Sequence, residues 1–136
     1  MSVVSELIIK EDDGSLGFGD YTLENKSKKS DFPYEGDLYK VKTFKEITKL
    51  EKNGLFVYES DPGTVVHEFK ADADRVSFKV EGYTDAQITL ELEPECEYNI
   101  KVGDSSSSMK TNLGGKLTFS ATLDEGVPVP VEVKKA

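Results

Sequence analysis

The chain has 136 residues, of which 37% are hydrophobic, and it carries a formal net charge of -9 at pH 7. This length and apolar content suffice for one ordinary domain or for two small β modules that share an interface. The negative charge repels phosphate backbones and anionic membranes, so we expect no nucleic-acid partner, and no apolar stretch is long enough for a membrane span.

The cysteine count and the first residues bear on the compartment. Cys96 is the only cysteine, which excludes an intrachain disulfide. Residues 1–10 lack the basic start and the long apolar core of a signal peptide, so the sequence as written predicts a cytoplasmic protein. The same chain as a trimmed fragment of an exported protein would be extracellular.

The first half of the chain predicts short strands separated by turns. Turn composition is found at Asp12-Asp13-Gly14 and at Asp61-Pro62-Gly63. The polar stretch from Glu24 to Asp37 has the composition of a loop. We expect strands over residues 7–9, 16–23, 38–43, 55–59 and 64–69.

The segment from Thr43 to Asn53 fits two structures. As a helix, it would begin with a capping box formed by Thr43 and Glu46 and would end at Asn53-Gly54. As a β-hairpin, it would place Asn53-Gly54 in a two-residue turn between two strands. We favour the hairpin, because the segment after the turn is rich in β-forming residues and the helix would be short.

Residues 72–136 alternate between apolar and polar side chains, a pattern that a strand places on opposite faces. The apolar members are Val76, Phe78 and Val80; Ile88, Leu90 and Leu92; Tyr98, Ile100 and Val102; and Leu117, Phe119, Ala121 and Leu123. One apolar and one polar face per strand predict an antiparallel sheet with one side in water. We therefore expect an all-β fold, an antiparallel β-sandwich with modules at 1–71 and 72–136 packed together and at most one short helix.

The last predicted strand contains two prolines at alternate positions, Pro128 and Pro130. Proline has no amide hydrogen, and amides two residues apart point to the same side of a strand. The strand would then pair normally on one side only, which predicts an edge strand with its valines toward the core. A proline-rich recognition tail is the alternative.

The segment from Leu92 to Val102 contains Pro94 and Tyr98 at a distinctive spacing. It resembles the Leu-x-Pro-x-x-x-Tyr-x-hydrophobic-x-hydrophobic signature of fibronectin type III and immunoglobulin-like modules, which occur in bacterial surface and carbohydrate-active proteins. The resemblance covers residues 72–136 and implies that the Tyr98 hydroxyl binds nearby backbone. The chain departs from fibronectin type III in having no tryptophan and two predicted strands after the tyrosine strand. Such sandwiches support many binding roles.

Residues suited to catalysis or metal binding are few. His67 is the only histidine, and in a regular strand it would point with Val65 and Phe69, as a packed or rim side chain. One histidine and one cysteine leave a zinc site short of ligands, so we expect no cofactor, with calcium at Asp-containing loops as the open alternative. The sequence contains no nucleophile elbow, phosphate-binding loop or zinc-protease motif, and we expect no enzyme.

The sequence favours a non-enzymatic module that binds a protein or a carbohydrate. Its candidate contact residues are the tyrosines outside the apolar stripes: Tyr21, Tyr34, Tyr39 and Tyr83. Tyrosine offers a rigid ring face and a hydroxyl, which suit contacts with sugars or proteins. Two alternatives stay open: a small intracellular structural protein that self-associates into a homo-oligomer, and a small glycoside hydrolase that uses two carboxylates.

Overall fold

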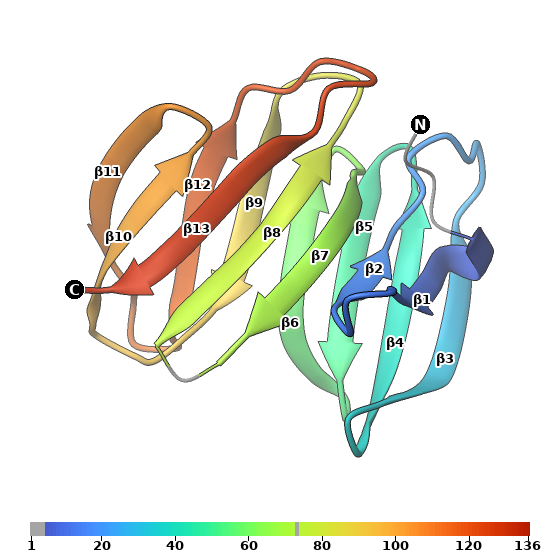
Figure 1. Ribbon diagram of the computed structural model, residues 1–136, viewed down its shortest axis with the longest axis horizontal. Coiled ribbons are helices and arrows are strands. Elements are labelled where there is room, and N and C mark those ends of the chain that lie inside the picture. Colours follow the sequence, from blue (N-terminus) through green and yellow to red (C-terminus); the bar gives the residue numbers. More distant parts are fainter. Residues whose placement is uncertain (1–4, 73) are drawn as a thin grey trace.

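The computed structural model describes residues 5–72 and 74–136, and within them two antiparallel sheets pack together (Figure 1). Sheet A has the strand order β1 (Ile8–Lys10), β2 (Leu16–Phe18), β7 (Val65–Ala71), β8 (Arg75–Glu81), β13 (Val129–Lys135), β10 (Glu97–Val102) and β11 (Ser105–Lys110). Sheet B has the order β12 (Lys116–Ala121), β9 (Ala86–Glu91), β6 (Leu55–Asp61), β5 (Ile47–Lys52), β4 (Asp37–Phe44) and β3 (Ser27–Tyr34). A short 3-10 helix, η1 (Ser5–Leu7), precedes β1. The predicted all-β sandwich is confirmed.

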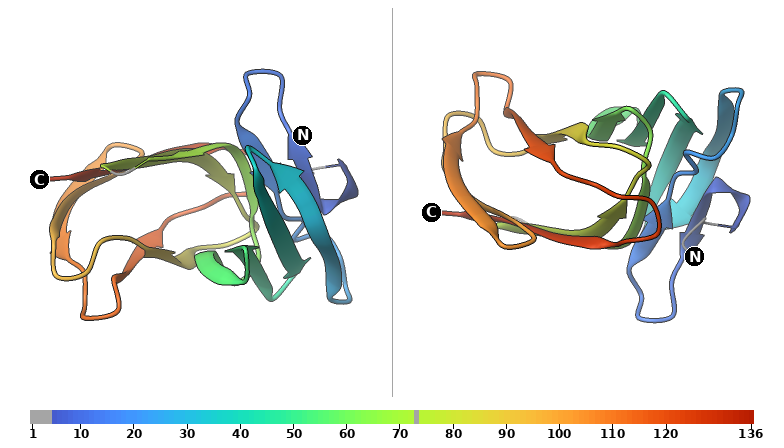
Figure 2. Two further views of the ribbon diagram at one scale, coloured as in Figure 1. Left: turned by 90° about the horizontal axis from the view of Figure 1, so that it is seen from below. Right: turned by 90° about the horizontal axis from the view of Figure 1, so that it is seen from above.

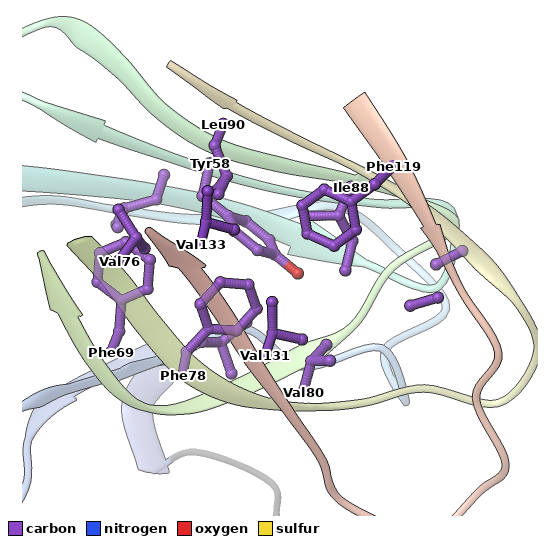
Figure 3. Packing of buried hydrophobic residues seen from close by; sticks show 14 of the residues in the cluster. Tyr58, Phe69, Val76, Phe78, Val80, Ile88, Leu90, Phe119, Val131 and Val133 are labelled. Carbon is purple, nitrogen blue, oxygen red and sulfur yellow. The ribbon is translucent and has the colours of Figure 1, made fainter. Parts of the chain in front are cut away.

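The two sheets face each other (Figure 2), and the space between them is filled by side chains that the alternation assigned to the interior (Figure 3). At most 6% of each of the following is exposed: Val76, Phe78, Val80, Ile88, Leu90, Tyr98, Ile100, Leu117, Phe119, Ala121 and Leu123. Tyr58 lies among them, with its ring in edge contact with Phe18 (5.1 Å between centroids) and Phe78 (5.7 Å). Its hydroxyl lies 2.8 Å from Thr64 Oγ1, so the polar end of this buried ring is satisfied.

The predicted boundary between residues 71 and 72 falls at the end of β7. Both sheets take strands from both sides of this boundary, and β7 pairs with β8 across it. One cluster of buried side chains also draws on both parts of the chain. Shared sheets neither require nor exclude that each part folds alone, so the division into two modules stays a prediction.

The hairpin favoured around Asn53-Gly54 is confirmed. β5 and β6 pair as antiparallel neighbours, with Lys52 opposite Leu55. Asn53 and Gly54 both have positive φ angles, 51° and 81°, as a two-residue hairpin turn requires. Asn53-Gly54 fitted both structures that the sequence allowed, and the β-forming residues after the turn pointed to the correct one.

The loop predicted for residues 24–37 is wrong, because residues 27–34 form β3 at the edge of sheet B. β3 pairs with β4 from Ser27 opposite Thr43 to Tyr34 opposite Asp37, with a register shift between Lys29 and Phe32. An edge strand keeps much of its surface in water, so its polar composition does not oppose strand formation.

The prediction that the last strand is an edge is also wrong, because β13 lies between β8 and β10. The ladder with β10 covers only the part of β13 from Val131 onward. Pro130 lies just beyond it, where its carbonyl accepts the Gly103 N–H at 2.9 Å, and Pro128 precedes the strand. The missing amides therefore fall where no neighbouring strand needs them.

Strict alternation fails in β7. The register of β7 against β8 shifts between His67 and Lys70, and Glu68 has a φ of 54°, which together mark a β-bulge. Because of the extra residue, Val66 and Phe69 both join the main core, whereas Val65 packs in a small cluster with Tyr21. The expectation that Phe69 points with His67 is therefore wrong, whereas Val65 and His67 keep the regular spacing before the bulge.

Candidate functional site

A cleft opens between the two sheets at one end of the sandwich. Its walls come from the β1–β2 turn and the end of β7 on one side, and from the β3–β4 turn and the β5–β6 hairpin on the other. The β3–β4 and β5–β6 turns lie at the lower end of the view in Figure 1. The cleft has a volume of about 530 Å³, within the range of small-molecule sites. Because Tyr34, Tyr39 and Phe56 line it, we name it the tyrosine cleft.

Two tight turns fix the wall formed by sheet B. Glu35 and Gly36 connect β3 to β4 with positive φ angles of 50° and 85°. The side chain of Asn53, in the next turn, accepts the Leu38 N–H at 2.9 Å and donates to Asp37 Oδ1 at 2.8 Å. Asn53 thus joins the two turns, which holds the aromatic wall of the cleft in place.

The two tyrosines of the cleft differ in the state of their hydroxyls. Their rings meet edge to face, with centroids 5.6 Å apart and planes at 75°. The Tyr34 hydroxyl donates to the Gly14 carbonyl at 2.7 Å and so ties the β3–β4 turn to the β1–β2 turn. Within residues 5–72 and 74–136, the Tyr39 hydroxyl has no hydrogen-bond partner, so it is available to a ligand.

Burial, together with the neighbouring charges, raises the pKa of both tyrosine hydroxyls of the cleft. Burial, followed by the charges of Asp37, Tyr34 and Glu35, raises the pKa of Tyr39 to about 12. Burial and the charges of Glu35 and Asp13 also raise the pKa of Tyr34. Both side chains therefore remain donors over the physiological pH range.

Two carboxylates of the cleft are held in the ionised form. The hydrogen bond from Asn53 lowers the pKa of Asp37, with a further contribution from Lys52, whose Nζ lies 3.4 Å from Asp37 Oδ2. Hydrogen bonds from Ser15 lower the pKa of Asp13 to about 2, and Lys70 Nζ lies 3.4 Å from Asp13 Oδ2. The rim of the cleft thus presents fixed acceptors and two ammonium donors to a ligand.

The other two predicted contact residues lie elsewhere and contact each other. The Tyr21 and Tyr83 rings have centroids 5.8 Å apart. Only 6% of Tyr21 is exposed, and it packs with Val65 and Ile9. The Tyr83 hydroxyl donates to the Lys45 carbonyl at 2.8 Å. The structure therefore gathers the four predicted tyrosines into two pairs, of which one lines the cleft.

The sequence analysis missed several residues of the cleft. Phe56, Asp37 and Lys52 line it, but the sequence placed them in an expected strand, an expected loop and the segment that fits either a helix or a hairpin, without a binding role. The available signal was the pair of turns Glu35-Gly36 and Asn53-Gly54, which mark two hairpins that end on the same side of sheet B. Residues flanking such turns meet at the end of a sandwich, where loops carry binding sites.

The histidine of β7 has an acidic partner that the sequence did not reveal. His67 Nδ1 lies 3.1 Å from both carboxylate oxygens of Glu11. Glu11 Oε2 also accepts the backbone N–H of Glu68 at 2.8 Å, so this carboxylate supports the bulge in β7. Both side chains are partly buried, with 26% of His67 and 19% of Glu11 exposed.

Asp-containing turns were the open alternative for calcium. In one of them, Asp72 Oδ1 accepts the backbone N–H groups of Asp74 and Arg75 at 2.9 and 3.0 Å. No group of three or more His, Cys, Asp or Glu side chains in the described ranges is placed to hold a metal ion. Likewise, no helix in these ranges is both long and apolar enough to cross a membrane.

A second hollow, of about 410 Å³, lies on the outer face of sheet A over β8 and β13. Four of its charged side chains pair with each other: Arg75 Nη2 lies 2.6 Å from Glu132 Oε2, and Lys79 Nζ lies 3.1 Å from Glu68 Oε2. Paired charges leave fewer groups for a ligand than the rings and the available hydroxyl of the tyrosine cleft. We therefore take the tyrosine cleft as the candidate site.

Comparison of the chain with protein-family models, curated proteins and solved structures finds no match. The contact implied by the resemblance at residues 92–102 is nevertheless present. The backbone N–H of Glu93 donates to the Tyr98 hydroxyl at 3.1 Å, and only 2% of Tyr98 is exposed. This contact links the end of β9 to β10 and stabilises the turn between the sheets.

Proposed function

We propose that the protein is a non-enzymatic binding module whose tyrosine cleft takes a carbohydrate. The observation that carries this proposal is Tyr39: its ring lines a ligand-sized cleft, and its hydroxyl has no partner among the described residues. A sugar ring has an apolar C–H face for such a ring and hydroxyls for the polar groups around it.

The polar groups of the cleft suit a neutral ligand with many hydroxyls. Asp37 and Asp13 supply ionised acceptors, Lys52 and Lys70 supply donors, and Tyr39 supplies a protonated hydroxyl. The opposite charges lie in pairs, so a neutral ligand could bridge them without burying an unpaired charge. A flat protein interface of standard size would need a larger surface than this cleft offers.

The pKa values of two carboxyls of the cleft, Asp13 and Asp37, support binding by these two groups rather than hydrolysis. A glycosidase needs one carboxylic acid that stays protonated near neutral pH, which requires a raised pKa. The pKa values of Asp13 and Asp37 are displaced in the opposite direction, by hydrogen bonds to their ionised forms. We therefore propose no catalytic step for this cleft.

The resemblance of residues 72–136 to fibronectin type III and immunoglobulin-like modules adds support of a general kind. The Tyr98 contact with the Glu93 backbone is the one that this resemblance implies. Sandwiches of this type host many binding roles, which supports a binding module; of the residues that line the tyrosine cleft, only Glu91 lies within the resemblance.

A glycan array followed by calorimetry of its best hit tests the proposal. We expect Tyr39→Phe to weaken binding about five- to tenfold through the loss of one hydrogen bond, and Tyr39→Ala to abolish it. Tyr83→Phe is the matched control, because it removes a tyrosine hydroxyl outside the cleft. Absence of saccharide binding, or equal affinity in wild type and Tyr39→Ala, would contradict the proposal.

A further inference from the structure

Five lysines gather on the outer side of sheet B, over β3, β4 and β5. They are Lys26, Lys28, Lys40, Lys42 and Lys49, and we name this surface the lysine face. The alternation of β4 explains its origin: Val41 and Thr43 are fully buried, so Lys40 and Lys42 point outward. The three strands are neighbours in the sheet, as Figure 1 shows.

The strand register places like charges directly opposite one another. Lys28 is the partner of Lys42 in β4, and Lys42 is the partner of Lys49 in β5. Neighbouring strands lie about 4.8 Å apart, and like charges at opposed positions destabilise a sheet. This repulsion lowers the pKa of Lys42. The charge of Lys26 is the largest cause, followed by partial desolvation and by the other lysines of the face.

Most of these ammonium groups lack a carboxylate partner. Within residues 5–72 and 74–136, Lys49 forms an ion pair with Glu51 at 3.7 Å, and the other four lysines form none. The whole chain has 26 acidic against 17 basic residues, so partners for these lysines are plentiful in the composition. The clustering of five lysines on one face is therefore not expected from the acidic composition of the chain, and it lowers the stability of the sheet.

The lysine face is flat and bordered by apolar side chains. The hollow among Lys40, Lys42, Lys49 and Glu51 measures only about 20 Å³, so the face has no groove there for a linear polymer. Leu38, which is 50% exposed, and Phe44 lie on the same side of β4 at its two ends. A flat cationic surface with apolar side chains at its margins complements a flat anionic surface.

The aromatic rings near the lysine face argue against an unpaired nucleic acid as the partner. Single strands need open ring faces on which bases stack. Phe44 has the Lys26 ammonium 5.8 Å from its ring centroid, and Phe56 has that of Lys116 at 4.5 Å. The ring faces are thus already occupied by cations.

We propose that the lysine face docks the protein on an anionic phospholipid bilayer. The net charge of -9 alone predicts repulsion from such a surface, and the segregation of five lysines on one face reverses this locally. Glu51 and Glu59 are the register partners of Lys40 and Lys49, so the five lysines still outnumber these two carboxylates on the face, which gives the docked protein one orientation. This docking does not depend on carbohydrate binding in the tyrosine cleft.

Co-sedimentation with vesicles tests this docking on the whole chain. We expect the protein to bind phosphatidylcholine vesicles that contain about 30% phosphatidylserine, but not vesicles of phosphatidylcholine alone. Raising the salt concentration from about 50 to about 200 mM should weaken binding, because exposed charges are screened. The triple variant Lys28→Gln/Lys42→Gln/Lys49→Gln should bind about 100-fold more weakly, at about fivefold for each lysine.

A matched control separates the lysine face from the total charge. Lys101→Gln/Lys110→Gln/Lys134→Gln removes three exposed lysines of sheet A and gives the same net charge, and we expect it to retain most of the vesicle binding. Lys42→Gln should raise Tm at low salt, which also shows that the face variants fold. Equal losses in the two triple variants, absence of binding to the anionic vesicles, or tighter binding to DNA than to the vesicles would overturn the proposal.

Discussion

The two tyrosine pairs of this protein have the same composition but different surroundings. Tyr34 and Tyr39 line an open cleft, and the Tyr39 hydroxyl has no partner among the described residues. Tyr21 is buried against Val65, and the Tyr83 hydroxyl is bound to backbone. The comparison teaches that solvent access and the partner of the hydroxyl decide which tyrosine serves a ligand, and which one serves packing.

The largest expected difference between the pairs is in stability. Tyr21→Ala leaves a cavity beside Val65 and should lower the free energy of unfolding by about 3–5 kcal/mol. Tyr39→Ala, in the open cleft, should cost about 1–2 kcal/mol. Urea unfolding of both variants checks this, and a cost for Tyr39→Ala as large as that for Tyr21→Ala would show that Tyr39 belongs to the core.

A third environment is the fully buried hydroxyl of Tyr98. Tyr98→Phe leaves the Glu93 N–H without its acceptor and should lower the free energy of unfolding by about 1–2 kcal/mol. Urea unfolding measures this loss, and Tyr39→Phe is its control, with an expected change near zero because that hydroxyl has no partner among the described residues. A Tyr98→Phe variant as stable as wild type would show that the corner contact is dispensable.

Removal of the Tyr83 hydroxyl and removal of the Tyr39 hydroxyl should have different, smaller effects on stability and on carbohydrate affinity. Tyr83→Phe removes a hydrogen bond to the Lys45 carbonyl at a partly exposed site and should cost about 0.5 kcal/mol. It should leave carbohydrate affinity unchanged, whereas Tyr39→Phe should lower the affinity and leave the stability unchanged. Thermal unfolding measures the stability of the two variants, and calorimetry measures their carbohydrate affinity. If Tyr83→Phe lowered the affinity and Tyr39→Phe lowered the stability, the roles assigned to the two pairs would be exchanged.

The smallest expected effect concerns acid. The pKa of Asp13 in the folded protein, about 2, lies below the ordinary value of 3.8, so ionised Asp13 favours the folded state above about pH 4. This contribution is lost as the pH falls from about 4 to about 2. Ser15→Ala removes the largest cause and should move the Asp13 pKa back toward 3.8. Carboxyl NMR titration of wild type and variant measures the shift, and an unchanged pKa would contradict the assigned cause.

β8, β9, β10 and β12 could be predicted from the sequence because each has one face in the core and one in water. β11 was missed, because it is exposed along its whole length and its serines carry no alternation. The same rule failed in β7, where the bulge at Glu68 turns the following side chains by one position. The prediction that β13 is an edge strand was wrong for another reason. A proline prevents pairing only with a neighbouring strand that reaches the proline, and the ladder between β13 and β10 begins after Pro130. Pairing partners and bulges depend on contacts between distant parts of the chain, which a local pattern does not contain.

The candidate site could be predicted in part. All four tyrosines were identified from their position outside the apolar stripes, but their sorting into pairs depends on which turns meet in space. The cleft needs the Tyr34 hydroxyl to reach the Gly14 carbonyl, 20 residues away in the chain. The acid beside His67 lies 56 residues away and is brought there by the pairing of β2 with β7.

Tyrosine-selective NMR during saccharide titration tests the central claim most directly, because it observes both pairs in one sample. With a ligand from the glycan array, we expect the ring signals of Tyr34 and Tyr39 to shift and those of Tyr21 and Tyr83 to stay in place. Shifts confined to Tyr21 and Tyr83, or unchanged signals of Tyr39 at saturation, would contradict the assignment of the cleft as the binding site.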